Sequence, residues 1–203
     1  MLLFLIRHGE TPPNLRREFQ GIGNFPLTDK GVTQANRIAS FFDDIPLNAL
    51  YASPMIRAME TAAPLAQAKG LAPVSIPAFH EVDCGRWEGG SFLKILADEG
   101  ELLRKWLTDG KTPAPEGESL GDVYARTKAP LHEIVDRHRH SSDNVAIVAH
   151  GAVNRTIICH LLGIPPDRSF CFDQENGCIN RFVLDDPYPP KLSMLNSTVH
   201  LGG

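Results

Sequence analysis

The stretch Leu2-Leu3-Phe4-Leu5-Ile6-Arg7-His8-Gly9-Glu10-Thr11 decides the fold of this chain. An uninterrupted apolar run is typical of a strand that is buried on both faces, and Gly9 marks the start of a loop. In an α/β sheet, the loops at the carboxyl ends of the strands build the functional sites. We therefore expect Arg7 and His8 to lie together in such a site.

A second stretch, Val145-Ala146-Ile147-Val148-Ala149-His150-Gly151, repeats this pattern of a buried strand followed by His-Gly. Gly151 also opens a helix predicted over residues 152–162, and the start of a helix beside an imidazole is a favourable place for an anion. We expect His8 and His150 to belong to one site.

The residue types in this site favour phosphoryl transfer. A neutral imidazole can attack phosphorus, while a planar guanidinium can hold two phosphate oxygens. Arg57 lies near the start of a helix that follows a predicted strand, so its guanidinium can reach the same pocket as Arg7. The alternatives are a solvated loop histidine for His8, a helix-capping histidine for His150, and surface ion pairs for the two arginines.

Composition excludes several classes of protein. The 203 residues are 42% apolar, which suits one large domain or a domain with an inserted cap. The net charge is −4 and there are no long Lys/Arg runs, so the sequence shows no basic stretch suited to binding nucleic acid or an acidic membrane. The expected partner is a small phosphorylated metabolite. No metal-ligand spacing is present, so neither a metal nor another cofactor is expected.

The chain also lacks the marks of export. Its four cysteines show no Cys-x-x-Cys spacing, which favours reduced thiols. No stretch reads as a signal-peptide core or a membrane span. We expect a cytoplasmic protein.

Strand-like and helix-like segments alternate, which predicts a three-layer α/β/α fold with a mostly parallel central sheet. Thr28 and Ser119 are expected helix N-caps, and Ser53-Pro54 is expected to start a third helix that ends near Gly70. The predicted strands are 2–6, 49–52, 74–76, 145–149, 179–184 and 193–196, and the predicted helices begin at or after 28, 53, 119 and 151.

Residues 79–117 form the least regular stretch, which we interpret as a small cap inserted into a single domain of residues 1–203. The cap should decide substrate choice, and its aromatic residues favour a packing role over stacking on substrate. Asn176-Gly177 predicts a tight hairpin between 170–172 and 179–184. An exposed edge in this last part of the sheet is compatible with a homodimer.

A phosphate ester also requires a proton for its leaving oxygen, which calls for a carboxylic acid. From the residues alone, the candidates are Glu10, Glu81, Asp83 and Glu88.

From end to end, the chain resembles the histidine phosphatase (phosphoglycerate mutase-like) superfamily, including its broad-specificity phosphatases and α-ribazole phosphatase. The motifs that carry the resemblance are Leu5-Ile6-Arg7-His8-Gly9-Glu10-Thr11, Asn14, Gln20-Gly21, Pro26-Leu27-Thr28, Gly31, Gln34-Ala35, Tyr51-Ala52-Ser53-Pro54, Arg57-Ala58, Thr61-Ala62, residues 81–89, Gly117-Glu118-Ser119 and Val148-Ala149-His150-Gly151.

The resemblance implies a role for each matching residue. It makes His8 the phosphorylated nucleophile, Glu81 the proton donor, and Arg7, Arg57 and His150 the phosphate pocket. Asn14 matches a phosphate-contacting residue of the family, and Gln20, Gly21 and Gly151 match further positions around the pocket. Gly151 stands where the acid phosphatase branch has its proton-donating aspartate, so the donor comes from elsewhere. Asn24 and Glu116 depart from the common family pattern without touching this chemistry.

The function implied is hydrolysis of a phosphomonoester, without a metal, through a phosphohistidine intermediate. A cofactor-dependent phosphoglycerate mutase is the alternative, because it shares this chemistry. The 79–117 segment is shorter than the insert of the glycolytic mutases, and Arg86, Lys94, Arg104, Lys105 and Lys111 do not match its paired basic residues. A third hypothesis is an inactive phosphate-binding module.

Overall fold

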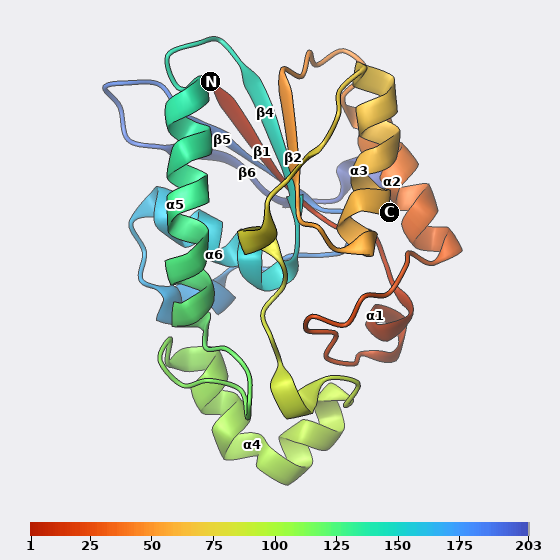
Figure 1. Ribbon diagram of the computed structural model, residues 1–203, viewed down its shortest axis with the longest axis vertical. Helices are drawn as coiled ribbons and strands as arrows, with labels where there is room; N and C mark the ends of the chain where they lie inside the picture. The colour runs from red at the N-terminus through yellow and green to blue at the C-terminus, as the bar shows by residue number, and fades with distance from the viewer. Residues whose placement is uncertain (203) are drawn as a thin grey trace.

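A six-stranded sheet organises the computed structural model, which describes residues 1–202 (Figure 1). The strand order is β3-β2-β4-β1-β5-β6. The first four strands run parallel, whereas β5 is antiparallel to both β1 and β6, so the predicted mostly parallel sheet is confirmed. The strands are β1 (Leu2–Arg7), β2 (Ala49–Ala52), β3 (Val74–Ser75), β4 (Asn144–Ala149), β5 (Ile179–Val183) and β6 (Lys191–Ser197).

Helices cover both faces of the sheet and complete the predicted three layers (Figure 1). The helices α2 (Asp29–Phe41) and α3 (Ile56–Lys69) pack on one face, and α5 (Leu120–His138) and α6 (Gly151–Leu162) pack on the other. Each face has its own apolar core, because side chains alternate between the two faces along β1.

Local sequence signals explain where several helices begin and end. The Thr28 hydroxyl accepts the Gly31 N–H at 3.1 Å and caps α2. Ser119 and Asp122 form a capping box at the start of α5. The helix α3 ends at Gly70, whose φ of +63° favours glycine. These three signals were predicted and are confirmed.

The predicted start of α3 at Ser53-Pro54 is wrong, since the helix begins at Ile56. The Ser53 N–H still donates to Val148 of β4 at 2.9 Å, so Ser53 continues the sheet. Its hydroxyl accepts the Met55 N–H at 3.3 Å and contacts His150, and it is therefore not available as the predicted helix cap.

The segment 79–117 is more regular than predicted, because it contains the 17-residue helix α4 (Phe92–Thr108). Non-helical dihedrals at Glu99 bend this helix. In Figure 1, α4 lies below the carboxyl ends of the strands. Trp87 and Trp106 are buried in the same core cluster as the sheet residues, as expected for aromatic residues with a packing role. Two 3₁₀ helices, η1 (Pro77–Phe79) and η2 (Gly85–Trp87), lead into α4.

The hairpin predicted at Asn176-Gly177 is wrong. The residues before it form part of the 3₁₀ helix η3 (Pro166–Cys171), and β5 pairs instead with β1 and β6. The strands β3 and β6 form the two edges of the sheet. The short helix α1 (Pro12–Arg16) was not predicted, nor were the 3₁₀ helices, among them η4 (Val199–Leu201).

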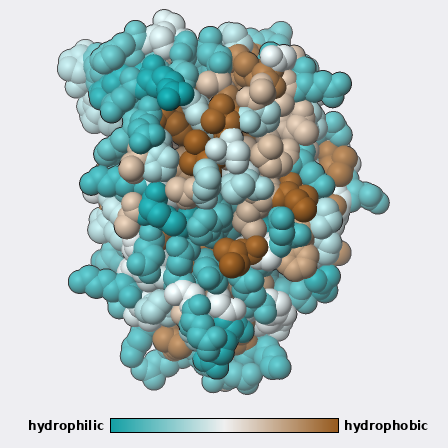
Figure 2. Space-filling model, in the orientation of Figure 1, coloured by the Kyte–Doolittle hydropathy of each residue, from teal (hydrophilic) through white to brown (hydrophobic). Residues whose placement is uncertain are grey.

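The surface is mixed in character. On the face drawn in Figure 2, apolar side chains form separate patches within a mostly hydrophilic surface. Within residues 1–202, no helix has the length and apolar character needed to cross a membrane. The cysteines Cys84, Cys159, Cys171 and Cys178 are all free thiols.

Candidate active site

The carboxyl ends of β1 and β4 bring the two strand-end histidines together. These strands are parallel neighbours with Arg7 opposite Ala149, and the His8 N–H donates to the Ala149 carbonyl at 3.0 Å. The ring centroids of His8 and His150 are 5.2 Å apart. The expectation that both histidines share one site therefore agrees with the geometry.

His8 is held in one tautomer. Its Nδ1 lies 2.7 Å from the Gly9 carbonyl, to which it donates, so Nε2 is the unprotonated nitrogen. The ring is only 2% exposed. Burial, and then the nearby Arg7 and Arg57 guanidinium groups, hold the pKa of His8 well below its ordinary value. The imidazole is therefore neutral at neutral pH.

Arg57 is a fully buried cation, and each of its three guanidinium nitrogens has a hydrogen-bond acceptor. Its Nη1 and Nη2 donate to the carbonyls of Gly23 at 2.7 Å and Gly21 at 3.0 Å. Its Nε donates to His150 Nδ1 at 3.2 Å. Burial lowers the pKa of Arg57 to about 10, which still leaves the group charged at neutral pH.

His150 lies behind Arg57 and does not line the pocket. Its Nδ1 accepts from Arg57, so its proton is on Nε2, which donates to the Ser53 hydroxyl at 2.7 Å. Burial, and then Arg57, His8 and Arg7, lower the pKa of His150 well below its ordinary value. In this structure Nδ1 holds Arg57, and Nε2 holds the ring against Ser53.

Arg7 presents an unsatisfied donor. Its Nη1 donates to the Gln174 carbonyl, but its buried Nε has no partner among residues 1–202. A buried N–H without an acceptor costs about 1–3 kcal/mol, which a bound anion would offset. Burial lowers the pKa of Arg7, while the negative charge of Glu81 opposes this change.

Of the four candidate acids, only Glu81 lines the pocket. Its carboxylate accepts the Val82 N–H at 2.9 Å and, at the start of α6, the Ala152 N–H at 3.3 Å. The other three are occupied elsewhere: Glu10 pairs with Lys30, Asp83 accepts from Gly85 N–H, and Glu88 accepts from Ile22 N–H.

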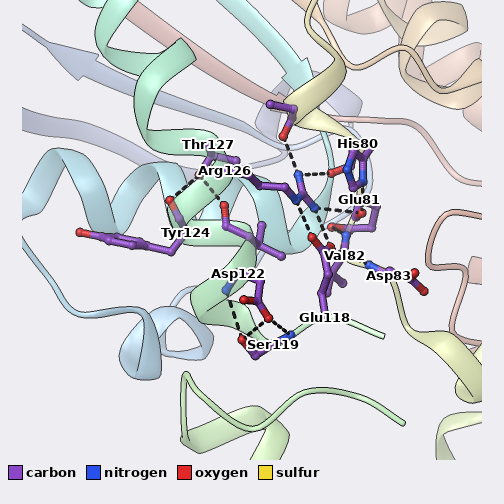
Figure 3. Close-up of polar contacts among 12 residues, drawn as sticks. His80, Glu81, Val82, Asp83, Glu118, Ser119, Asp122, Tyr124, Arg126 and Thr127 are labelled. Carbon is purple, nitrogen blue, oxygen red and sulfur yellow. Dashed lines mark hydrogen bonds and ion pairs between the residues drawn. The ribbon is translucent and has the colours of Figure 1, made fainter. Parts of the chain in front are cut away.

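Arg126 of α5 fixes the backbone that carries Glu81 (Figure 3). Its guanidinium donates to the carbonyls of Ala78, His80 and Glu81 at 2.5, 2.9 and 3.1 Å. It also forms a two-pronged ion pair with Glu118 at 2.8 and 3.0 Å.

Glu118 extends this network to the next residues of the loop. Its Oε2 accepts the Asp83 N–H at 3.0 Å, and its own N–H donates to the Asp83 carbonyl at 2.8 Å. Burial alone would raise the pKa of Glu118, but the hydrogen bonds from Arg126 and Asp83 hold it below its ordinary value. The backbone on both sides of Glu81 is thereby tied to α5.

Asn14 and Gln20 both line the pocket. Asn14 Oδ1 is within 2.8–3.1 Å of donors on Thr11 and Asn176, so its Nδ2 is the group left for a ligand. Gly21 acts through its carbonyl, which accepts from Arg57, and its φ of +51° favours glycine.

Gly151 keeps space open between charged groups. A side chain at this position would begin 3.1 Å from Arg155 Nη1, 3.7 Å from Glu81 Oε2 and 3.8 Å from Arg7 Nε. Three pocket-lining charges therefore surround the first turn of α6.

Sequence reasoning missed Arg155, which lies one helical turn after Gly151 and on the same face of α6. That spacing is a signal which could have identified it. Asn176 was also missed as a site residue, because Asn-Gly indicated a hairpin. Its amide donates to Asn14 Oδ1 at 3.0 Å and lies 3.3 and 3.4 Å from the carbonyls of His8 and Gly9.

These residues enclose a pocket of about 300 Å³. We call Arg7, His8 and Arg57, with His150 behind them, the pocket floor. The pocket wall is the side that includes the cap, and its residues are Phe19, Phe92, Trp106, Arg155 and Phe170. A larger groove of about 770 Å³ lies over α2 and the C-terminal residues, but it contains none of the floor residues. Within residues 1–202, no cluster of three or more His, Cys, Asp or Glu side chains has a metal-binding arrangement.

Comparison with known proteins agrees with this geometry. The phosphoserine phosphatase 1 of Hydrogenobacter thermophilus is 31% identical over 98% of this chain and 94% of its own. An adenosylcobalamin/alpha-ribazole phosphatase of Salmonella typhimurium is 27% identical over 97% and 96%. A probable phosphoglycerate mutase of Proteus mirabilis is 32% identical over 80% and 75%.

Solved structures of phosphatases share this fold. The phosphoserine phosphatase of Entamoeba histolytica, solved with phosphoserine, superimposes with a TM-score of 0.85 at 30% identity, covering 98% of both chains. The family model of the histidine phosphatase superfamily (branch 1) matches residues 3–198. The chain therefore belongs to the histidine phosphatase superfamily, branch 1, and is an enzyme of the phosphatase type.

Proposed function

We propose that this enzyme hydrolyses a small phosphomonoester, without a metal, through a phosphohistidine intermediate on His8. The observation that carries the proposal is the state of His8: a neutral ring, with Nδ1 bound to Gly9, beside two buried guanidinium groups. An unprotonated Nε2 in that setting is a nucleophile that faces a site for an anion.

Binding comes first in the proposed reaction. The phosphate oxygens contact Arg7, Arg57, the Nδ2 of Asn14 and the N–H groups at the start of α6. The unsatisfied Nε of Arg7 gains an acceptor in this step. His150 keeps Arg57 oriented, and a direct contact of His150 with phosphate stays a prediction.

Chemistry then proceeds in two halves. His8 Nε2 attacks phosphorus while Glu81 donates its proton to the departing alkoxide, giving phospho-His8 and a free alcohol. Glu81 next takes a proton from a water that attacks the phosphohistidine, which releases inorganic phosphate and restores both residues. The charge on phosphorus is balanced by guanidinium groups, so the reaction has no step that requires a metal.

Substrate size and location follow from the same features. A pocket of about 300 Å³ is at the small end of ligand sites and favours a small organic phosphate. The four free thiols are compatible with a cytoplasmic location, which we retain in the proposal. We retain residues 79–117 as a cap of one domain, and the edge strand β6 as the place to look for a homodimer.

A phosphoglycerate mutase is the second candidate, because a relative with that name is 32% identical. A mutase must hold both phosphates of the bisphosphoglycerate that forms when the phosphoenzyme returns its phosphoryl group. None of the basic residues of the 79–117 segment lines the pocket, and this favours hydrolysis; they are Arg86, Lys94, Arg104, Lys105 and Lys111.

The test is phosphate release by the purified enzyme in excess EDTA, measured against phosphoserine, 3-phosphoglycerate, sugar phosphates, nucleotides, α-ribazole phosphate and an aryl phosphate. We expect turnover of at least one ester at an unchanged rate when the chelator is added. Isomerisation of 3-phosphoglycerate with 2,3-bisphosphoglycerate present, without phosphate release, would assign the mutase instead. No reaction in either assay would favour a binding module.

A further inference from the structure

We propose that Arg155 binds a carboxylate on the leaving group of the substrate, so that this enzyme selects phosphomonoesters of hydroxy acids over those of neutral alcohols. The inference rests on the proposed function, since it assigns the second anionic group of the same ester. Arg155 is a substrate-binding residue in this account and takes no part in bond breaking.

The first observation is that contacts within the protein hold the Arg155 side chain in place. Its Nε donates to the Phe172 carbonyl at 2.7 Å, and its guanidinium carbon lies 4.9 Å from the centroid of the Phe170 ring. These contacts fix the plane of the group. Among residues 1–202, no acceptor hydrogen-bonds its two Nη groups, although Arg155 lines the pocket. The fork is thus preorganised and free to bind a ligand.

The second observation is the balance of charge. Arg7, Arg57 and Arg155 all line the pocket. A phosphomonoester dianion matches the two floor arginines. When Glu81 carries the proton that it donates, the pocket still holds three guanidinium groups, and the other carboxylate that lines it, Glu18, is paired with Arg16. Burial, and then repulsion from Arg7, lower the pKa of Arg155, while the negative charges of Glu81 and Asp173 oppose this change. One further negative charge on the substrate would balance the third guanidinium.

The third observation is position. Arg155 Nη1 and Glu81 Oε2 lie 3.1 and 3.7 Å from the point where a side chain at Gly151 would begin, so both groups border the same small space. Glu81 marks the leaving oxygen, so an anion bound by Arg155 belongs to the alcohol and lies within a few bonds of that oxygen. A carboxylate fits this place because it matches the planar fork of a guanidinium.

The experiment compares two ester pairs that differ in the carboxylate. The pairs are 3-phosphoglycerate with glycerol 3-phosphate, and phosphoserine with phosphoethanolamine. In the wild type we expect kcat/KM to favour the carboxylate ester of at least one pair by about 10- to 100-fold, the value of one charged hydrogen-bonded contact. In Arg155→Gln this preference should disappear, chiefly through a higher KM for the acid ester.

Matched variants separate binding from folding. Arg104→Gln removes an exposed cation of α4 outside the pocket and should leave the preference unchanged. Arg155→Lys keeps the charge without the fork and should retain part of it. The wild-type comparison needs no variant, so it tests the inference even if Arg155→Gln does not fold.

The outcomes are distinguishable. A wild type that hydrolyses esters but shows no carboxylate preference in either pair overturns the inference and leaves the proposed function intact. An equal loss of kcat/KM for both members of a pair in a folded Arg155→Gln also overturns it, because Arg155 would then serve phosphate. A wild type that releases no phosphate from any ester refutes the proposed function itself.

Discussion

The pocket floor and the pocket wall differ in how uniformly they are buried. On the floor, His8 is 2% exposed and Arg57 and His150 are 0% exposed, and all three side chains are hydrogen-bonded within the protein. The wall is mixed, because Trp106 is 3% exposed whereas Phe92 is 39% exposed, on a helix that bends at Glu99. Preorganised groups lower a reaction barrier because they need not reorient. We infer that the floor sets the reaction and the wall sets the substrate.

Removing the proposed nucleophile, His8, should have the largest effect. We expect His8→Ala to lower kcat by about 10⁴-fold or more, as is usual when a covalent nucleophile is deleted. Rapid quenching with radiolabelled substrate should detect an acid-labile phosphoenzyme in the wild type and none in the variant. His132→Ala, an exposed histidine of α5, is the matched control. Normal turnover by His8→Ala would rule out the mechanism.

Glu81→Gln should give the next largest effect, and it should depend on the leaving group. Alkyl esters need the donated proton, so their kcat should fall by about 10²- to 10⁴-fold, whereas an activated aryl phosphate should lose about tenfold or less. Steady-state rates over a series of leaving groups give this slope. Glu133→Gln, exposed on α5, controls for the substitution. A loss that is the same for all leaving groups would point to another proton donor.

Arg126→Met tests whether the loop that carries Glu81 must be fixed. Freed from its bonds to Ala78, His80 and Glu118, this loop can move, and a displacement of about 1 Å costs up to about 100-fold in kcat. The loss should show the leaving-group dependence of Glu81→Gln, and the double variant should lose little more than Glu81→Gln alone.

Arg137→Met, on the exposed face of the same helix, is the control for this variant. A purely structural role for Arg126 would instead give a stability loss of about 1–3 kcal/mol with an unchanged leaving-group slope. Urea unfolding beside the kinetics separates the two results.

The buried floor histidines predict a pH dependence of stability. In the unfolded chain, His8 and His150 have the ordinary histidine pKa of about 6.5. In the folded protein their pKa values lie well below this. The unfolded state therefore binds more protons, and the free energy of unfolding should fall as pH drops below that value, by up to about 1.4 kcal/mol per pH unit for each histidine.

Urea unfolding at about pH 7.5 and about pH 5.5 measures this dependence. His150→Asn should reduce the slope, and His132→Asn, at an exposed position, should not. A free energy of unfolding that rises as the pH falls would mean that His8 and His150 are protonated in the folded protein.

The smallest effect is expected at the wall. Phe92 stacks on Phe19 with ring centroids 6.0 Å apart. Phe92→Ala should raise KM for an aryl phosphate by about two- to tenfold, the range for one aromatic contact, and should leave kcat unchanged. Leu93→Ala, at 69% exposure, is the control. A large fall in kcat in Phe92→Ala would show that floor and wall are not separable.

The sequence predicts the floor better than the wall for a physical reason. Arg7, His8 and His150 follow apolar runs that can only be buried strands, and parallel neighbours must deliver their carboxyl ends to the same edge. Arg155 is held by contacts with Phe170, in the 3₁₀ helix η3, and with Phe172, just after it, and this irregular stretch has no periodic signal. Asn176 was misinterpreted because Asn-Gly specifies a turn without specifying what the turn connects.

The structure also changes the interpretation of single residues. Ser53 has the sequence of a helix cap, yet its hydroxyl contacts His150. Arg126 is one of many charged residues on α5, and only tertiary structure distinguishes it from the exposed Arg137. Whether a charge is solvated or is bound to distant carbonyls depends on packing, which spacing along the chain does not encode.

The central place of β1 has a consequence for biosynthesis. This strand is flanked by β4 and β5, and the Asn176 amide lies against the backbone of His8 and Gly9. During translation, His8 therefore emerges long before the segments that surround it. A chain that stalls between residues 150 and 176 contains β4 but lacks β5, so one edge of β1 has no partner strand. We expect such incomplete chains to be more prone to aggregation than the full chain, because an unpaired strand edge is exposed.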